Sequence, residues 1–273
     1  AMSVQFQGQE RTLPQMARYQ EETDRSVREA AWRAVAERRM RDREEIDGIY
    51  DQMVALRHKV AINAGFRDFT AYAFKEKHRF DYGERECRAF HDACEKAVVP
   101  LVRRLSAKRR EKLSLAQLRP WDLAVDVKGR PPLRPFENGR ELQSKCVEVM
   151  RRLDPRLGEM LASMGDGSNT KGVKTGESLD LDSRRGKAPG GYQSMLERRR
   201  VPFIFMNAAG MSNDVTVMLH EAGHAFHSML AKHEPLLAYR SAPIEFCEVA
   251  SMSMEMLTMP HMGVVYRSEE DLA

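Results

Sequence analysis

The 273-residue sequence lacks most of the features that mark secreted, membrane-bound or disulfide-stabilised proteins. Its four cysteines include no C-x-x-C pair and form no dense framework, which indicates a reduced, cytoplasmic chain. The first residues, AMSVQFQGQERTLPQ, have no apolar core of the kind that a signal peptide needs. No apolar run is long enough to span a bilayer. We therefore expect a cytoplasmic protein without a membrane partner.

A large excess of charge of one sign is also absent. The chain carries 44 Lys and Arg residues against 40 Asp and Glu residues, which gives a net charge of +4. In the most basic stretches, residues 37–45 and 103–112, acidic residues are interleaved with the basic ones. This pattern is typical of solvated helix faces rather than of a phosphate-binding surface, so we expect no nucleic-acid partner. A basic helical nucleic-acid binder is the most distant alternative.

Helix-forming segments make up most of the chain. A short hairpin is expected to turn at Gly8, and Thr12 with Gln15 forms a capping box for a first short helix. Longer helical stretches are expected at residues 24–63, at 84–112 with an interruption near Pro100, and at 139–164. A strand at 201–207 precedes another helix, which can be capped by Ser212 or Asn213. The sequence therefore predicts a mainly α fold of the α+β class, with a small β-sheet just before that last helix.

The helix that follows the strand contains an unusual set of polar residues. Its sequence VTVMLHEAGHAFHSML, residues 215–230, is apolar nearly all round yet includes His220, Glu221, His224 and His227. The three histidines fall within an arc of roughly 60° on the helix. Side chains at positions i and i+4 lie one turn apart, so His220 and His224 can direct one ring nitrogen each toward the same zinc ion.

Glu221 lies at the edge of the same face, close enough to contact a water bound to that metal. A carboxylate in this position can take a proton from the water as a general base, which is the chemistry of the H-E-x-x-H motif. Gly223 is costly inside a helix by about 1 kcal/mol. Its presence indicates that another backbone approaches the helix closely.

A catalytic zinc keeps three protein ligands and one open position, so a third ligand is needed. Leu230 stands where a metzincin would have its third histidine. The remaining candidates are acidic residues on a later helix, expected over residues 242–259. Helix geometry leaves both Glu245 and Glu248 open as the ligand. On an isolated helix, these residues and Glu255 would be ordinary surface carboxylates.

The motifs HEAGHAFH and EFCEVASMSMEML together resemble the oligoendopeptidase F and thimet oligopeptidase family of zinc metallopeptidases, which are gluzincins. The segments LDLDSRRGKAPGGY, VQFQGQERTLPQ and LRPWD are similar to the same family. The resemblance implies that Glu248 is the third ligand and that the chain binds one Zn²⁺. It also implies a multi-helix zincin-type core around a deep channel, and a zinc metalloendopeptidase that cleaves short peptides.

The resemblance covers only the central portion of a typical family member. We therefore expect residues 1–164, a helical region with the hairpin, and residues 165–273, the zinc-binding catalytic core, to be parts of one larger catalytic domain truncated at both ends. Family members carry a downstream Tyr- and His-containing stretch that stabilises the tetrahedral intermediate. The missing remainder of the polypeptide is accordingly an expected partner. The alternative function is a catalytically weak or inactive zinc-containing helical module that binds peptides without cleaving them.

Other residues are weaker candidates. His227 is expected to contact substrate or a ligand rather than the zinc, and Glu255 either orients a ligand histidine or is solvated. Lys187 and Tyr192 are candidates for the lining of the site. The strand at 201–207 is either an edge strand that pairs with extended peptide substrate or an ordinary core strand.

Overall fold

The computed structural model describes residues 2–168, 178–266 and 268. Within these ranges the chain is mainly helical with a small sheet before the helix that carries the H-E-x-x-H motif, which confirms the predicted fold class. The chain divides into two compact units, Ala1–Tyr19 with Pro132–Ala273 and, separately, Gln20–Pro131. The domain boundary expected after residue 164 stays a prediction about the whole polypeptide.

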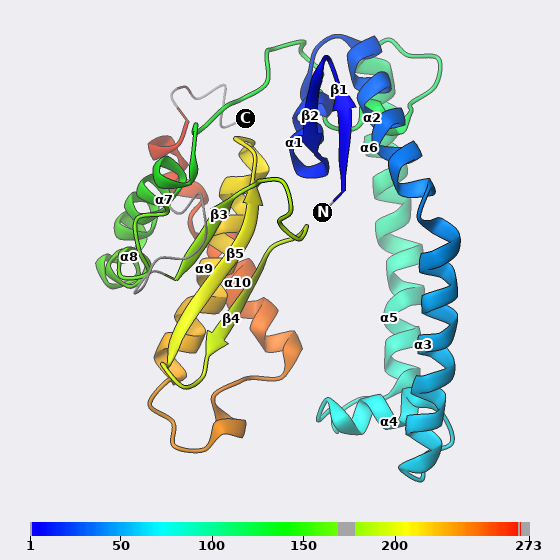
Figure 1. Ribbon diagram of the computed structural model, residues 1–273, viewed down its shortest axis with the longest axis vertical. Helices are drawn as coiled ribbons and strands as arrows, with labels where there is room; N and C mark the ends of the chain where they lie inside the picture. The colour runs from blue at the N-terminus through cyan, green and yellow to red at the C-terminus, as the bar shows by residue number, and fades with distance from the viewer. Residues whose placement is uncertain (1, 169–177, 267, 269–273) are drawn as a thin grey trace. The chain divides into compact units, whose positions relative to one another are not determined.

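The first unit holds the sheet and the H-E-x-x-H helix (Figure 1). Its strands are β1 (Ser3–Phe6), β2 (Gln9–Thr12), β3 (Leu179–Asp182), β4 (Tyr192–Leu196) and β5 (Val201–Ala208). Its α-helices are α1 (Leu13–Ala17), α7 (Gly139–Leu153), α8 (Pro155–Ala162), α9 (Ser212–Ala231) and α10 (Ile244–Leu257). Short 3-10 helices are η1 (Arg18–Glu21), which runs into the second unit, η4 (Leu237–Tyr239) and η5 (Met259–Val264).

The N-terminal hairpin and its cap form as predicted. β1 and β2 pair antiparallel, and the turn between them places Gln7 and Gly8 at φ angles of 51° and 76°. Two positive φ angles in succession suit a tight hairpin turn, and glycine adopts one of them without strain. The backbone N–H of Thr12 donates to Gln15 Oε1 at 3.0 Å, and the backbone N–H of Gln15 donates to Thr12 Oγ1 at 3.3 Å. This reciprocal pair is the capping box at the start of α1.

The second sheet has the strand order β3-β5-β4, so β5 is its central strand. β3 pairs parallel to β5, and β4 pairs antiparallel to it. The hypothesis that residues 201–207 form an edge strand is therefore wrong, because β3 and β4 cover both sides of β5. The outer strands are β3 and β4, and both come from segments that the sequence patterns did not mark as strands. Alternate residues of β5 from Pro202 to Ala208 are buried, as expected for a strand with one face on the core.

α9 packs across one face of this sheet, and α10 packs against α9 (Figure 1). The helix begins where Asp214 Oδ2 accepts the backbone N–H groups of Ala209 and Met211, at 2.8 and 2.9 Å. Neither expected cap, Ser212 nor Asn213, holds this position, because Met211 is the N-cap residue. The core between the helices and the sheet includes Leu142, Met150, Leu179, Ile204, Met206, Met218 and Leu219. The H-E-x-x-H helix is therefore fixed on its apolar sides by the core.

A buried lysine fixes the connection from β3 to β4. The Lys187 ammonium donates to Asp180 Oδ1 at 2.9 Å and to the backbone oxygens of Asp180 and Asp182 at 3.0 and 2.9 Å. Arg184 holds the same Asp180 carboxylate through two hydrogen bonds of 2.6 and 2.9 Å. Burial acts to raise the pKa of Asp180, but the hydrogen bonds from Arg184 and Lys187 outweigh it and leave this pKa below its usual range. Lys187 therefore has a structural role, with its charge satisfied by the chain itself.

Two expected helices are each divided in the structure. The stretch 24–63 breaks at Arg41 and Asp42, and the stretch 139–164 breaks at Asp154. At the second break, Asp154 Oδ1 accepts the backbone N–H of Arg156 at 2.8 Å, and Pro155 cannot donate to the preceding helix. The first break lies among helix-forming residues, so composition gave no signal for it. The interruption expected near Pro100 is present, because Pro100 lies in the first turn of a new helix.

The second unit is helical. It contains α2 (Arg25–Met40), α3 (Arg43–Asn63), α4 (Phe69–Glu76), α5 (Glu84–Ala93), the π-helical turn η2 (Cys94–Val98), α6 (Val99–Lys112) and η3 (Pro120–Asp122). Its polar core is Asp122, which is fully buried and accepts from Arg25 and from Arg28. Among the helices in the described ranges, none combines the length and apolar character that crossing a membrane requires.

Candidate metal and catalytic site

Two histidines of the candidate site come from consecutive turns of α9. His220 and His224 are one turn apart, and their ring centroids lie 4.9 Å apart at an interplanar angle of 85°. Their side chains are 25% and 16% exposed, so both rings are largely withdrawn from solvent. Burial lowers the pKa of His224, which favours the neutral imidazole that can bind a metal.

Glu248 reaches the histidines because α10 crosses α9 at a glycine. A Cβ atom added to Gly223 would lie 2.6 Å from Ser251 Cα and 2.7 Å from the Ala250 backbone oxygen. Only glycine allows the two backbones to approach this closely, which confirms the close approach predicted for Gly223. Ser251 lies one turn after Glu248 on α10, so the crossing sets the position of Glu248 as well.

The ligand atoms of His220, His224 and Glu248 all lie within 4.8 Å of one another. Glu248 Oε2 is 3.4 Å from His220 Nε2, and Glu248 Oε1 is 3.8 Å from His224 Nε2. Two ligands bound tetrahedrally at about 2.0 Å from one ion would be separated by about 3.3 Å. The observed separations are close to that value. Glu245, the other acid left open by helix geometry, is not in this group.

Glu255 orients the first histidine. Its Oε1 lies 2.6 Å from His220 Nδ1, and Glu255 follows Glu248 by about two turns of α10. A carboxylate on Nδ1 holds that nitrogen as the N–H and leaves the Nε2 lone pair free for a metal. Of the two alternatives for Glu255, the structure favours contact with a ligand histidine over a solvated acid.

Glu221 is buried beside this cluster, with only 7% of its surface exposed. Its Oε2 atom has no hydrogen-bond partner among the described residues. Burial raises the pKa of Glu221, and the nearby Glu248 charge adds to this, while His220 and the backbone N–H of Gln193 act in the opposite direction. A buried, incompletely bonded carboxylate next to a group of metal-type ligands has the properties of a general base.

Two further residues hold the site together, and the sequence patterns did not mark either. Gln193 directs its backbone N–H to the Glu221 carboxylate from β4. Ser251 is fully buried, and its Oγ donates to Glu248 Oε2 at 3.1 Å. The spacing of three residues between Glu248 and Ser251 on one helix offered a signal for the second contact. The first depends on strand pairing and had no local signal.

The remaining candidates lie outside the group of ligand atoms. His227 lines a hollow next to His224, so it faces the space beside the cluster. Tyr192 stacks on Phe205, with ring centroids 5.0 Å apart, and Lys187 lies over the same Phe205 ring at 4.4 Å. The structure does not bring Tyr192 to the cluster, and its role in the site stays a prediction.

The hollow next to His224 is named here the His227 pocket. Its volume is about 300 Å³, and its lining consists of Gln193, Ser194, Met195, Glu197, His224, His227, Ser228, Leu237, Arg240, Ser241 and Cys247. These residues come from β4, the turn after β4, the second half of α9, the segment after α9 and the first turn of α10. The pocket thus opens directly beside one of the candidate metal ligands.

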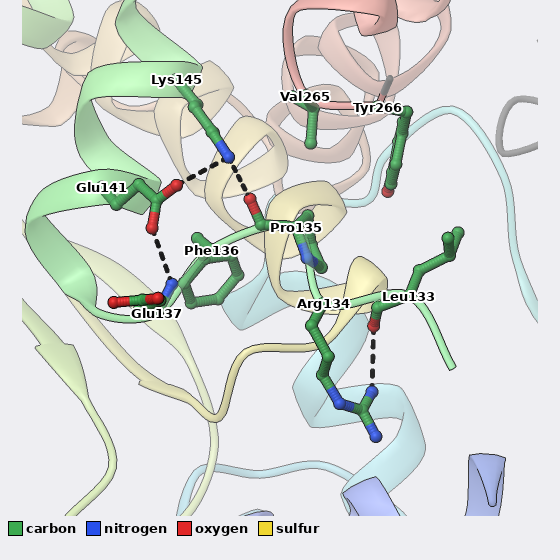
Figure 2. Close-up of a pocket in the computed structure, with 9 residues that line it drawn as sticks. All are labelled: Leu133, Arg134, Pro135, Phe136, Glu137, Glu141, Lys145, Val265 and Tyr266. Atoms are coloured by element: carbon green, nitrogen blue, oxygen red, sulfur yellow. Dashed lines mark hydrogen bonds and ion pairs between the residues drawn. The ribbon is translucent and has the colours of Figure 1, made fainter. Parts of the chain in front are cut away.

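A second hollow of about 340 Å³ lies at the start of α7, between residues 133–137 and Val265 with Tyr266. Figure 2 shows that Lys145 and Glu141 bind one another and nearby backbone groups, and that Arg134 contacts the Leu133 backbone oxygen. Lys145 contacts the Pro135 backbone oxygen and pairs with Glu141 at 2.8 Å, and Glu141 accepts the Glu137 backbone N–H at 2.8 Å. This hollow contains none of the candidate ligands, so it is a less suitable catalytic site than the His227 pocket.

The fold and the site together define a helix-rich chain with a His–His–Glu group and a buried glutamate beside it. Residues 18–271 match the family model described as peptidase family M3. The chain therefore belongs to peptidase family M3, which confirms the predicted resemblance.

Solved structures with similar folds cover almost the whole chain. A structure described as an oligoendopeptidase F from Bacillus anthracis str. Ames has a TM-score of 0.89 and 29% identity, over 98% of this chain and 48% of its own. A structure described as PZ peptidase A with inhibitor 2 has a TM-score of 0.90 and 31% identity, over 98% of this chain and 46% of its own. Oligopeptidase PepF of Bacillus subtilis (strain 168) is 30% identical over 162 residues, 58% of this chain and 22% of its own length. The chain thus spans less than half the length of these relatives.

Proposed function

We propose that the chain is the zinc-binding catalytic core of a metalloendopeptidase that hydrolyses short peptides. The observation that carries this proposal is the convergence of the His220, His224 and Glu248 ligand atoms within 4.8 Å, next to the buried carboxylate of Glu221. Membership of peptidase family M3 supports hydrolysis of peptide bonds. The names oligoendopeptidase F and oligopeptidase PepF support a peptide substrate rather than a folded protein.

The donor set fits one zinc ion. Two imidazoles and one carboxylate are the ligands of many catalytic zinc sites, which leave a further position open. His220 Nε2, His224 Nε2 and one oxygen of Glu248 would hold the ion, with Glu255 on His220 Nδ1 and Ser251 on the Glu248 carboxylate fixing two of the ligands. When bound there, zinc lowers the pKa of water and polarises a carbonyl group.

Glu221 supplies the proton transfer in this mechanism. Its unpartnered Oε2 accepts the proton of the attacking water as the water oxygen bonds to the scissile carbonyl carbon. The protonated carboxyl then delivers that proton to the amine nitrogen as the C–N bond breaks, so that one water is consumed for each peptide bond. The Gln193 backbone N–H faces the Glu221 carboxylate and favours its charged form. Burial raises the pKa of Glu221, which makes the carboxylate a stronger base.

Peptide substrate would align along β4. In the antiparallel pairing with β5, Met195 is opposite Pro202, which has no N–H to donate. Backbone hydrogen bonds therefore do not join this pair of residues. Backbone groups of alternate residues point to opposite sides of a strand, so those of Gln193 and Met195 point away from β5. Gln193 indeed reaches Glu221 on that side. An extended peptide paired to this outer edge of β4 would pass beside the catalytic carboxylate.

The decisive experiment compares the wild-type chain with Glu221→Gln. Both proteins are expected to bind about one zinc per chain, because Glu221 is not a ligand, and His224→Ala is expected to lose the metal. A quenched-fluorescent peptide should be cleaved by the wild type, and Glu221→Gln should slow cleavage by at least about 10²-fold. Equal cleavage by the two proteins would remove Glu221 from the mechanism. A zinc-loaded wild type that binds the peptide without cleaving it would instead favour the non-catalytic peptide-binding module.

A further inference from the structure

Two basic segments contribute residues to the lining of the His227 pocket, and together they are named here its mouth. One is the turn between β4 and β5, residues 197–200, with the sequence ERRR, and the other is the end of α9 with the residues that follow it. Arg200 Nη1 donates to the Lys232 backbone oxygen at 3.1 Å, and Arg240 Nη1 lies 3.4 Å from Glu197 Oε2. These two contacts join the two segments beside the pocket.

The charges at this mouth do not balance. Five basic side chains face two acidic ones, the basic set being Arg198, Arg199, Arg200, Lys232 and Arg240, and the acidic set Glu197 and Glu234. Among the described residues, the side chains of Arg198, Arg199 and Lys232 make no hydrogen bond or ion pair. The two adjacent arginines on α7, Arg151 and Arg152, differ because their charges are paired. Each forms an ion pair with Glu148 at 3.0 Å.

Arg240 forms a fixed positive wall of the pocket rather than a mobile side chain. Its Nε donates to the Glu234 backbone oxygen at 2.7 Å, and its Nη2 donates to the Pro235 backbone oxygen at 3.3 Å. The side chain is only 13% exposed. A guanidinium has five N–H donors, so these contacts and the long one to Glu197 leave donors unused. The bonds to neutral carbonyl groups hold the guanidinium in place, and its one acidic partner in the pocket lining is Glu197, at 3.4 Å.

We propose that the His227 pocket binds a carboxylate of the peptide substrate, within one or two residues of the scissile bond. This inference rests on the proposed peptidase function and adds a substrate class to it. The distance follows from the lining, because one pocket of about 300 Å³ includes both the candidate ligand His224 and Arg240. Unpaired basic side chains around a concave mouth attract anions and concentrate them there. The carboxylate belongs either to an acidic side chain or to the C-terminus of a short peptide.

The test measures peptide binding by the zinc-loaded Glu221→Gln protein, so that binding is read without cleavage. Fluorescent peptides of one sequence carry Glu, Gln or Lys at each successive position, and each peptide is made with a free or an amidated C-terminus. Because exposed ion pairs each change affinity by a factor of about two to five, we expect a preference of about fivefold for Glu over Gln at one position, or for the free C-terminus. The same preference should weaken between 50 and 500 mM salt, since ions screen exposed charges (Debye length about 10 Å at 0.1 M).

Two charge-matched variants test the location. Arg198→Ala/Arg199→Ala should reduce the preference to less than about twofold, whereas Arg151→Ala/Arg152→Ala, with the same change in net charge, should retain it. A preference for the acid at a single position identifies the side chain, and a preference for the free C-terminus with no position effect identifies the terminal carboxylate. Equal binding of Glu, Gln and Lys peptides, or an equal loss in both variants, would overturn the proposal while leaving the peptidase function standing. Failure of every peptide to bind, together with no cleavage by the wild type, would overturn both.

Discussion

Replacing Gly223 with alanine should displace α10 from α9 and damage the metal site from a distance. The added Cβ would lie 2.6 Å from Ser251 Cα, 2.7 Å from the Ala250 oxygen and 3.1 Å from the Ala250 carbonyl carbon. Carbon atoms in contact prefer a separation of about 3.5–4.0 Å. All three atoms belong to the α10 backbone, so no side chain can rotate to relieve the contact. The helices must separate by about 1 Å.

The magnitude of the effect follows from two opposing contributions. Overpacking a helix crossing costs about 1–3 kcal/mol, while exchanging glycine for alanine inside a helix stabilises it by about 1 kcal/mol. Zinc coordination tolerates only about 0.2 Å of displacement, and Glu248 lies one turn from Ser251. We therefore expect the zinc affinity to fall at least about 10-fold, a loss of about 1.4 kcal/mol in binding free energy.

The assay titrates zinc against a competing chromophoric chelator and measures urea unfolding of the metal-free protein. Gly48→Ala is the matched control, because Gly48 lies within α3 with nothing within 4 Å of an added Cβ. That variant should bind zinc as the wild type does and should be more stable by about 1 kcal/mol. The difference in stability between the two variants then isolates the steric contribution. A Gly223→Ala protein with wild-type zinc affinity would refute the idea that this crossing positions Glu248.

Three further changes test the contacts around the site and the sheet. Glu255→Gln should weaken zinc binding about 10- to 100-fold by removing the carboxylate from His220 Nδ1, and an unchanged zinc dissociation constant would show that the 2.6 Å contact does not matter. Asp180→Asn should flatten the acid end of the stability profile measured by urea unfolding between pH 7 and pH 2. Because the pKa of Asp180 is lower in the folded state, its contribution to the free energy of unfolding is complete above the unfolded pKa of about 3.9. This contribution is lost as the pH falls through the lower folded pKa. Parallel stability profiles for the two proteins would contradict this. Lys187→Met should destabilise the protein by about 3–5 kcal/mol, because Asp180 loses a buried partner and two backbone oxygens lose their donor. A change in the free energy of unfolding below about 1 kcal/mol would mean that Arg184 alone satisfies the Asp180 carboxylate.

The sequence by itself determined the local parts of the candidate site. His220, Glu221 and His224 belong to one helix, so the spacing of the residues and the 3.6-residue period were enough to place them on one face. The hairpin at Gly8 and the capping box at Thr12 were predictable for the same reason, since each depends on residues within a few positions of one another. Gly223 could be interpreted as a close approach because glycine is unfavourable within a helix without such a cause.

Only the tertiary structure decided which distant residues join that face. Helix periodicity left Glu245 and Glu248 equivalent, and the crossing of α10 over α9 brought Glu248 to the histidines and Glu255 to His220. Strand order likewise made β4 an outer strand, with Gln193 against Glu221, although residues 201–207 carried the stronger strand pattern. These contacts join residues 24 to 35 positions apart along the chain. Local propensities do not encode contacts at that separation, because they arise from the packing of whole elements against one another.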